Sequence, residues 1–212
     1  DESSKPLKKL DNKELLFWTI DQALLSENID KIVISSPDLE SLNKAKESYG
    51  GKIETHKRAE DLAKLNSSLK ETILEIIKRE EDKGNHFDIV TVLYIDYPFK
   101  SFWQIDESID TLRLFDVDSV DGVLLDNRFY YKHLGKGMEP IVEGGGLKLE
   151  RDQLYRRVGG IHSIFTQSIR ETPNLLGDVI GHINFDPISG FQIRSDLDWE
   201  VAKIICKKFL KQ

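Results

Sequence analysis

The run Phe87–Ile95, Phe-Asp-Ile-Val-Thr-Val-Leu-Tyr-Ile, constrains the fold more than any other part of the sequence. It is rich in β-branched residues and apolar on both alternating faces, which is typical of a strand buried in the middle of a parallel sheet. Asp96-Tyr97-Pro98-Phe99 follows directly and ends the strand. A strand buried on both sides needs helices on both faces of its sheet.

Helices and strands alternate along the rest of the chain. Apolar residues at helical spacing, with capping residues at several ends, predict helices over residues 13–26, 38–49, 69–83, 102–115 and 196–210, and another near Gln167. Short apolar runs predict strands over residues 31–36, 119–125, 160–165 and 178–185. This alternation favours an α/β fold with a mostly parallel sheet and right-handed crossovers.

Composition indicates one soluble domain, residues 1–212. Hydrophobic residues make up 39% and charged residues 32%, and this length is enough for one core but short for two. The net charge of -7 argues against a nucleic-acid partner, and no apolar run reaches the roughly 18 residues that cross a membrane. Cys206 has no second cysteine to pair with, and no signal peptide is visible, so we expect a cytoplasmic protein.

Ligands of such sheets bind beyond the carboxyl ends of the strands. That rule points to residues 35–38, to residues 94–100 and to the loop after Leu125. It also exposes a gap, because the helix that starts at Lys13 has no strand before it, whereas a doubly wound sheet normally begins with a central strand and a phosphate-binding loop. The chain opens at Asp1 without a methionine, which leaves open that something upstream was removed or left out.

Six segments, in order, resemble the acylneuraminate and ketodeoxyoctonate cytidylyltransferases. They are residues 5–20, 32–38 (Ile-Val-Ile-Ser-Ser-Pro-Asp), 58–63 followed by Ser67 and Ser68, 93–99 (Leu-Tyr-Ile-Asp-Tyr-Pro-Phe), 155–161 (Tyr-Arg-Arg-Val-Gly-Gly-Ile) and 195–200 (Ser-Asp-Leu-Asp-Trp-Glu). The fourth is similar to L-Q-G-D-E-P-L of the ketodeoxyoctonate branch. The resemblance implies a three-layer α/β/α, Rossmann-like nucleotide-diphospho-sugar transferase fold. It also implies transfer of a cytidylyl group from CTP to an acidic sugar of the sialic acid type, with release of pyrophosphate.

The resemblance also implies roles for individual residues. Cytidylyl transfer needs cations and a metal at the phosphates, and Asp96, just past a buried strand, suits Mg²⁺. The implied catalytic residues are Lys5 and Asp96, and the implied nucleotide ligands are Lys5, Arg58, Ser67, Ser68 and Tyr94. The implied sugar ligands are Lys100, Arg156 and Arg151 (or Lys148), and the implied Mg²⁺ ligands are Asp96, Asp196 and Asp198.

Residues 126–158 are irregular and carry several glycines. This loop or hairpin excursion resembles the family's dimerisation extension, so we expect a homodimer.

Several positions depart from the family's pattern. Only Asp1–Ser4 precede Lys5 where the family has its glycine-rich loop, and Gln192-Ile193-Arg194 stands where the family has its second metal motif. Helix capping alone would also explain Ser67, Ser68, Asp196 and Asp198. A catalytically impaired relative that binds a nucleotide or sugar, or serves as an interaction domain, is therefore a second hypothesis. A nucleotidyltransferase with another base or acceptor is a third.

Overall fold

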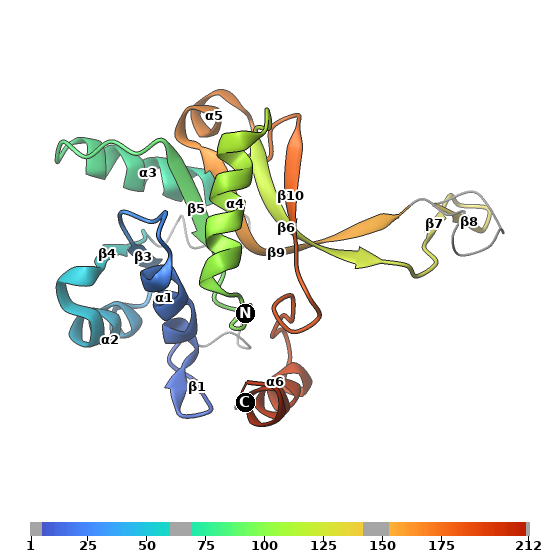
Figure 1. The fold of residues 1–212 in the computed structure, drawn as a ribbon, viewed down its shortest axis with the longest axis horizontal. Helices are drawn as coiled ribbons and strands as arrows, with labels where there is room; N and C mark the ends of the chain where they lie inside the picture. Colours follow the sequence, from blue (N-terminus) through green and yellow to red (C-terminus); the bar gives the residue numbers. More distant parts are fainter. Residues whose placement is uncertain (1–5, 60–68, 142–152, 211–212) are drawn as a thin grey trace.

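The computed structural model describes residues 6–59, 69–141 and 153–210 (Figure 1). Its larger sheet has the spatial order β10–β6–β9–β5, formed by β5 (Ile89–Leu93), β6 (Ser119–Asp126), β9 (Leu154–Phe165) and β10 (Ile180–Asn184). β10 is parallel to β6, whereas β9 is antiparallel to both β6 and β5. The α/β class is confirmed, but the sheet is mixed because β9 runs opposite to the other three strands.

β9 is reversed because it returns from an excursion that β6 begins. Beyond the sheet the two strands continue side by side into an arm that ends in the hairpin of β7 (Tyr131–His133) and β8 (Met138–Pro140) (Figure 1). The ladder shifts register between Asp121 and Val123, and Gly159 adopts a left-handed φ of 76° within this bulge. The predicted excursion, residues 126–158, is therefore partly a long two-stranded ladder.

A second sheet pairs β3 (Val33–Ser36) in parallel with β4 (Glu54–Lys57). β4 was not predicted, because its sequence Glu-Thr-His-Lys is polar and carries no apolar alternation. α1 (Leu15–Leu25) and α2 (Leu39–Tyr49) pack on this sheet through a core of Leu16, Phe17, Ile20, Ala45 and Ile53. β5 was expected in the middle of one sheet, but it lies at the edge of the larger one, and β3 does not pair with it.

Helices cover both faces of the larger sheet. α4 (Phe102–Leu114) packs on one face, where Ile105, Ile109 and Leu112 contact apolar side chains of β6, β9 and β10. α3 (Leu69–Glu81) and α5 (Thr166–Glu171) pack on the other face around Ile164. These layers cover both faces of the sheet and leave the strand ends and connecting loops to carry chemistry.

The remaining elements are a short hairpin, the last helix and a 3-10 turn. β1 (Lys9–Leu10) and β2 (Lys13–Glu14) form a hairpin whose two turn residues, Asp11 and Asn12, both have positive φ. α6 (Asp196–Lys208) packs Trp199, Ala202 and Cys206 against Leu10 and Leu15, and a 3-10 turn, Gly50–Lys52, follows α2. Among the described residues, no helix is long and apolar enough to cross a membrane.

Candidate active site

The turn that follows β5, residues 94–100, is braced from inside by an amine. Lys100 Nζ donates to the backbone oxygens of Tyr94 at 2.7 Å and Tyr97 at 2.6 Å, and to Thr19 Oγ1 at 2.9 Å. The side chain is 1% exposed, and burial lowers the pKa of the Lys100 amine to about 7. The family resemblance implied that Lys100 binds the sugar. The hydrogen bonds instead direct its amine into the protein, where it fixes the shape of the turn.

Asp96 projects from this turn and joins it to the loop before α6. Asp96 Oδ2 accepts a hydrogen bond from Gln192 Nε2 at 2.5 Å, and the Asp96 backbone oxygen accepts one from Ile193 N at 2.9 Å. Asp96 is half-buried, so its carboxylate stands at the surface beyond the carboxyl end of β5. This is the position that the sequence predicted for it.

The charges of Asp96 and of two arginines act on the hydroxyl of Tyr97, the residue that follows Asp96. Burial raises the pKa of the Tyr97 hydroxyl, and the negative charge of Asp96 adds to that increase. The positive charges of Arg194 and Arg156 oppose the increase, and Arg194 also donates a hydrogen bond to the hydroxyl. The structure therefore brings together one carboxylate, one phenol and two guanidinium groups from three separate segments of the chain.

Arg156 stands where the arm leaves the sheet. Its Nε lies 3.9 Å from Asp126 Oδ2, and its side chain is 46% exposed. Hydrogen bonds from Arg128 and Tyr130 hold the pKa of Asp126 well below its usual range. Because Asp126 already has these two partners, the exposed part of the Arg156 guanidinium can reach a ligand.

The start of α6 does not form a metal centre with Asp96. Asp198 Oδ2 accepts from Ser195 Oγ at 2.8 Å, Ser195 N at 2.9 Å and Arg194 N at 3.0 Å, in a capping box. Asp196 is fully exposed, 3.9 Å from Lys8. No group of three or more His, Cys, Asp or Glu that could hold a metal ion occurs in the described ranges. These bonds explain Asp198 as a helix cap.

Arg58 lies at the carboxyl end of the smaller sheet. Its guanidinium donates to Ser35 Oγ at 3.4 Å and to the Ser35 backbone oxygen at 3.3 Å. Ser35 Oγ also contacts His56 Nδ1 at 3.0 Å, and His56 Nε2 lies 3.4 Å from Glu75 Oε1. The predicted nucleotide residue Arg58 and the predicted loop at residues 35–38 therefore meet, as the rule about strand ends implies.

A buried charged cluster that the sequence analysis missed lies beside Tyr94. Arg157 Nε is 2.7 Å from Asp121 Oδ2, and the negative charge of Asp121 and the positive charge of Arg157 both act on the Tyr94 hydroxyl, whose pKa burial raises. His162 Nδ1 is 2.9 Å from Asp121 Oδ1, and His162 Nε2 is 2.8 Å from the Leu175 backbone oxygen. The sequence signal that could have revealed this cluster is the presence of polar residues, Asp121 and His162, inside otherwise apolar strands.

Five residues singled out from the sequence, Lys5, Ser67, Ser68, Lys148 and Arg151, lie outside the described residues.

Comparisons with known proteins agree with this architecture. The profile of a family described as Cytidylyltransferase matches residues 3–134, more than half of the chain. The fold is similar to that of a 4-diphosphocytidyl-2C-methyl-D-erythritol synthase from Anaerococcus prevotii, with a TM-score of 0.70 and 12% identity over 94% of this chain and 88% of that one. It is also similar to a CMP:2-keto-3-deoxy-manno-octonic acid synthetase complexed with CTP, with a TM-score of 0.68 and 12% identity over 96% and 92% of the two chains. Another 4-diphosphocytidyl-2C-methyl-D-erythritol synthase has a similar fold, with a TM-score of 0.68 and 10% identity over 96% of this chain and 94% of that one. A search of curated proteins found no match.

Replacing Lys100 by methionine tests the brace. The variant leaves two buried carbonyl groups without their donor, so we expect its free energy of unfolding to fall by about 1–3 kcal/mol. The folded pKa of about 7 lies below the ordinary value of 10.5, so the unfolded chain binds more protons between these two values. Lys100 therefore makes stability rise with pH across that window, and Lys100→Met loses this contribution.

Urea unfolding of both proteins at about pH 6.5 and about pH 9 measures the effect. Lys203→Met, which removes an exposed lysine paired with Glu200, is the matched control and should keep the rise. An equal rise in wild type and Lys100→Met would contradict the assignment.

Proposed function

Because this chain belongs to the cytidylyltransferase family, we propose that it transfers the cytidylyl group of CTP to a hydroxyl of an acidic sugar of the sialic acid type and releases pyrophosphate. The observation that carries the proposal is the position of Asp96. This carboxylate lies just beyond the carboxyl end of β5, next to Tyr97, whose hydroxyl feels the positive charges of Arg156 and Arg194. Nucleotides and their phosphates bind at this edge of α/β sheets.

In this reaction the sugar hydroxyl oxygen attacks the α-phosphorus of CTP in line. The bond from the α-phosphorus to the oxygen that bridges to the β-phosphate breaks, its electron pair leaves with pyrophosphate, and the hydroxyl proton passes to water. Negative charge on the phosphoryl oxygens is the part of the transition state that the protein can stabilise. Arg58, at the carboxyl end of β4, and Arg194, which hydrogen-bonds the Tyr97 hydroxyl, are the cations that we assign to that charge.

Asp96 is the described residue that would hold Mg²⁺. Gln192 occupies one of its carboxylate oxygens. A single protein carboxylate fits a magnesium ion that arrives with the nucleotide, because Mg²⁺ in nucleotide sites takes one or two carboxylates together with phosphate oxygens and water. When bound, the ion would neutralise phosphate charge, while Gln192 holds the Asp96 carboxylate in place.

Arg156 accounts for a preference for an acidic acceptor. Its planar guanidinium matches the geometry of a carboxylate, and nearly half of the side chain is exposed. Arg194 lies near the same phenol, Tyr97, so an anionic sugar that enters here meets two positive charges.

Two features favour a second candidate, a relative that binds a nucleotide or sugar without turning it over. Arg194 places a cation next to the phenol and Asp96, and Asp198 is committed to its helix cap. Both features reduce the carboxylates available to a metal ion. Binding without product release would distinguish this candidate from the enzyme.

We further propose that the protein is a homodimer in which the arm contacts a second copy. The arm exposes large apolar side chains around the β7–β8 hairpin: Phe129, Tyr131, Leu134, Met138 and Ile141. Several exposed apolar side chains on one projecting arm are unfavourable in water and are covered when a second copy packs on them.

CTP binding tests the nucleotide site. We expect CTP to bind more tightly than UTP or ATP in titration calorimetry, and Mg²⁺ to strengthen that binding. In Asp96→Asn the Mg²⁺-dependent gain should be lost and the rate of pyrophosphate release should fall about 100-fold, because the metal loses its protein ligand. Asp116→Asn, at an exposed aspartate beyond the C-terminus of α4, is the matched control. Absence of nucleotide binding at millimolar concentration would rule out the enzyme.

Acceptor choice tests the role of Arg156. Pyrophosphate release from CTP should depend on an eight- or nine-carbon acidic sugar, and Arg156→Ala should raise the KM for that sugar about 10–100-fold while the affinity for CTP is kept. Arg170→Ala, which removes an exposed arginine paired with Glu81 on the opposite part of the molecule, should change neither constant. Turnover of a polyol phosphate in place of the acidic sugar would instead support another acceptor class.

Light scattering tests the arm. The native mass should be about twice the 24.4 kDa of the chain. Leu134→Glu should shift the protein towards the monomer, because it places a charge on the surface that the proposed dimer would bury. Leu114→Glu, at a leucine that is 77% exposed at the end of α4, should leave the mass unchanged. A monomeric wild type would contradict the dimer.

A further inference from the structure

His56 is the buried residue of β4, and both nitrogens of its ring have polar partners. The residue is 4% exposed, whereas the other three residues of the strand are not buried. Its Nδ1 lies 3.0 Å from Ser35 Oγ, and its Nε2 lies 3.4 Å from Glu75 Oε1. An apolar side chain would fill the same space without removing a polar group from water. The two polar contacts, rather than packing, therefore explain why an imidazole stands at this position.

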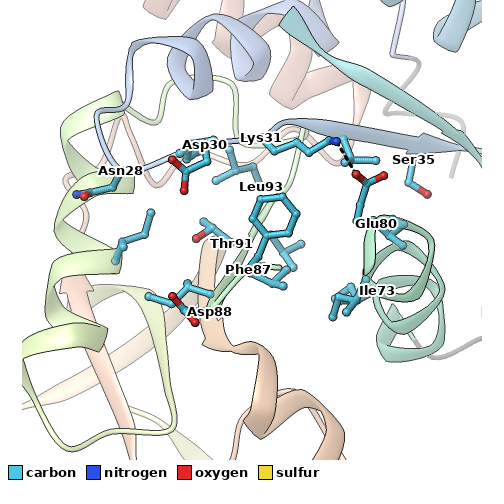
Figure 2. Close-up of a pocket in the computed structure, with 18 of the residues that line it drawn as sticks. Asn28, Asp30, Lys31, Ser35, Ile73, Glu80, Phe87, Asp88, Thr91 and Leu93 are labelled. Carbon is cyan, nitrogen blue, oxygen red and sulfur yellow. Dashed lines mark ion pairs between the residues drawn. The ribbon is translucent and has the colours of Figure 1, made fainter. Parts of the chain in front are cut away.

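Strand pairing brings Ser35 and His56 together. β3 and β4 are parallel, and these two residues are direct partners in the ladder, so their side chains point to the same face of the smaller sheet. Ser35 lines a cavity of about 350 Å³ that Ile73 of α3 also lines (Figure 2). Glu75, on the same helix, reaches the ring of His56 from this side. Two strands and one helix thus each supply one polar group.

Arg58 is attached to the same place through its backbone and through its side chain. Its N–H donates to the Ser36 backbone oxygen at 3.0 Å, one residue beyond the end of β4. Its Nε donates to Ser35 Oγ at 3.4 Å, and its Nη2 donates to the Ser35 backbone oxygen at 3.3 Å. These two bonds use two of the five guanidinium donors and fix the plane in which the other three point. Ser35 therefore determines where this arginine presents its charge.

The donors and acceptors of these four side chains can be arranged in one consistent order. A guanidinium only donates, so Ser35 Oγ is the acceptor towards Arg58. The hydroxyl has a single proton, which is then available for His56 Nδ1. A carboxylate only accepts, so an imidazole proton on Nε2 faces Glu75. In this order every contact pairs one donor with one acceptor.

We propose that Glu75, His56 and Ser35 are positioning residues that hold the Arg58 guanidinium ready for CTP. His56 keeps its proton on Nε2 towards Glu75, its Nδ1 accepts from the Ser35 hydroxyl, and the lone pairs of that oxygen face Arg58. A guanidinium fixed in advance loses less conformational freedom when it binds a ligand. The inference rests on the proposed function, in which Arg58 acts on the phosphates, and it extends the site to two residues that act only through Arg58.

Calorimetry with CTP tests this role through two substitutions of His56. His56→Leu should weaken CTP binding about tenfold, because the Ser35 hydroxyl loses its acceptor and no longer orients Arg58. His56→Asn should recover most of the affinity, because its amide oxygen can accept from Ser35 in place of Nδ1. His86→Leu, at an exposed histidine before the amino end of β5, is the matched control and should bind CTP as the wild type does.

A double-mutant cycle separates an effect through Arg58 from a general loss of structure. In the Arg58→Ala background, His56→Leu should cause no further loss of CTP affinity, because the group that it positions is already absent. A further tenfold loss in that background would overturn the inference, as would equal losses in His56→Leu and His56→Asn. Wild-type affinity in His56→Leu would overturn the inference and leave the proposed function standing.

The ¹⁵N spectrum of the imidazole tests the hydrogen-bond order without CTP and without relying on a variant that folds. In the wild type at neutral pH, His56 Nε2 should give the signal of a protonated nitrogen and Nδ1 that of an unprotonated one, and Glu75→Ala should reduce this difference. A proton on Nδ1 would overturn the proposed order. Absence of CTP binding by the wild type would instead overturn the proposed function, and the role of Arg58 with it.

Discussion

The buried amine of Lys100 holds together the parts of the molecule on which the candidate site depends. It links α1, through Thr19, to the turn that follows β5, through two backbone oxygens. That turn carries Asp96, which in turn contacts the loop leading to α6 through Gln192. Removing an amine from water is unfavourable unless hydrogen bonds replace those lost. Three short bonds do so here, and they leave the turn one conformation that satisfies all of them.

Much of this architecture could be predicted from the sequence, because the signals are local. Helical spacing and caps located α1 to α6, and the apolar run before Asp96 located β5. The rule that ligands bind beyond strand ends selected residues 35–38 and residues 94–100, and the second segment carries Asp96 at the carboxyl end of β5. Arg58 was singled out by the family resemblance, and it contacts Ser35 of the first segment. Sequence patterns of this kind report which side of an element is buried, and burial was what these elements required.

Contacts between distant parts of the chain could not be predicted in the same way. β4 is polar because only His56 of its four residues is buried, and the outer half of β9 is charged because it faces water in the arm. A lysine at position 100 could bind a ligand as far as the sequence shows. Its structural role follows from the hydrogen bonds of its amine to Thr19 and to two backbone oxygens. The sequence is likewise consistent with Asp198 as a metal ligand or as a helix cap. The three hydrogen bonds that its carboxylate accepts identify it as the cap.

β9 is one strand of twelve residues whose ends lie in different surroundings. Its inner half is clamped between β5 and β6, and its outer half belongs to the projecting arm, with Gly159 and the register shift between them. Arg156 belongs to the outer half, three residues before Gly159. The guanidinium whose charge acts on Tyr97 is therefore carried by the arm, so the position of the arm relative to the sheet sets the position of that charge.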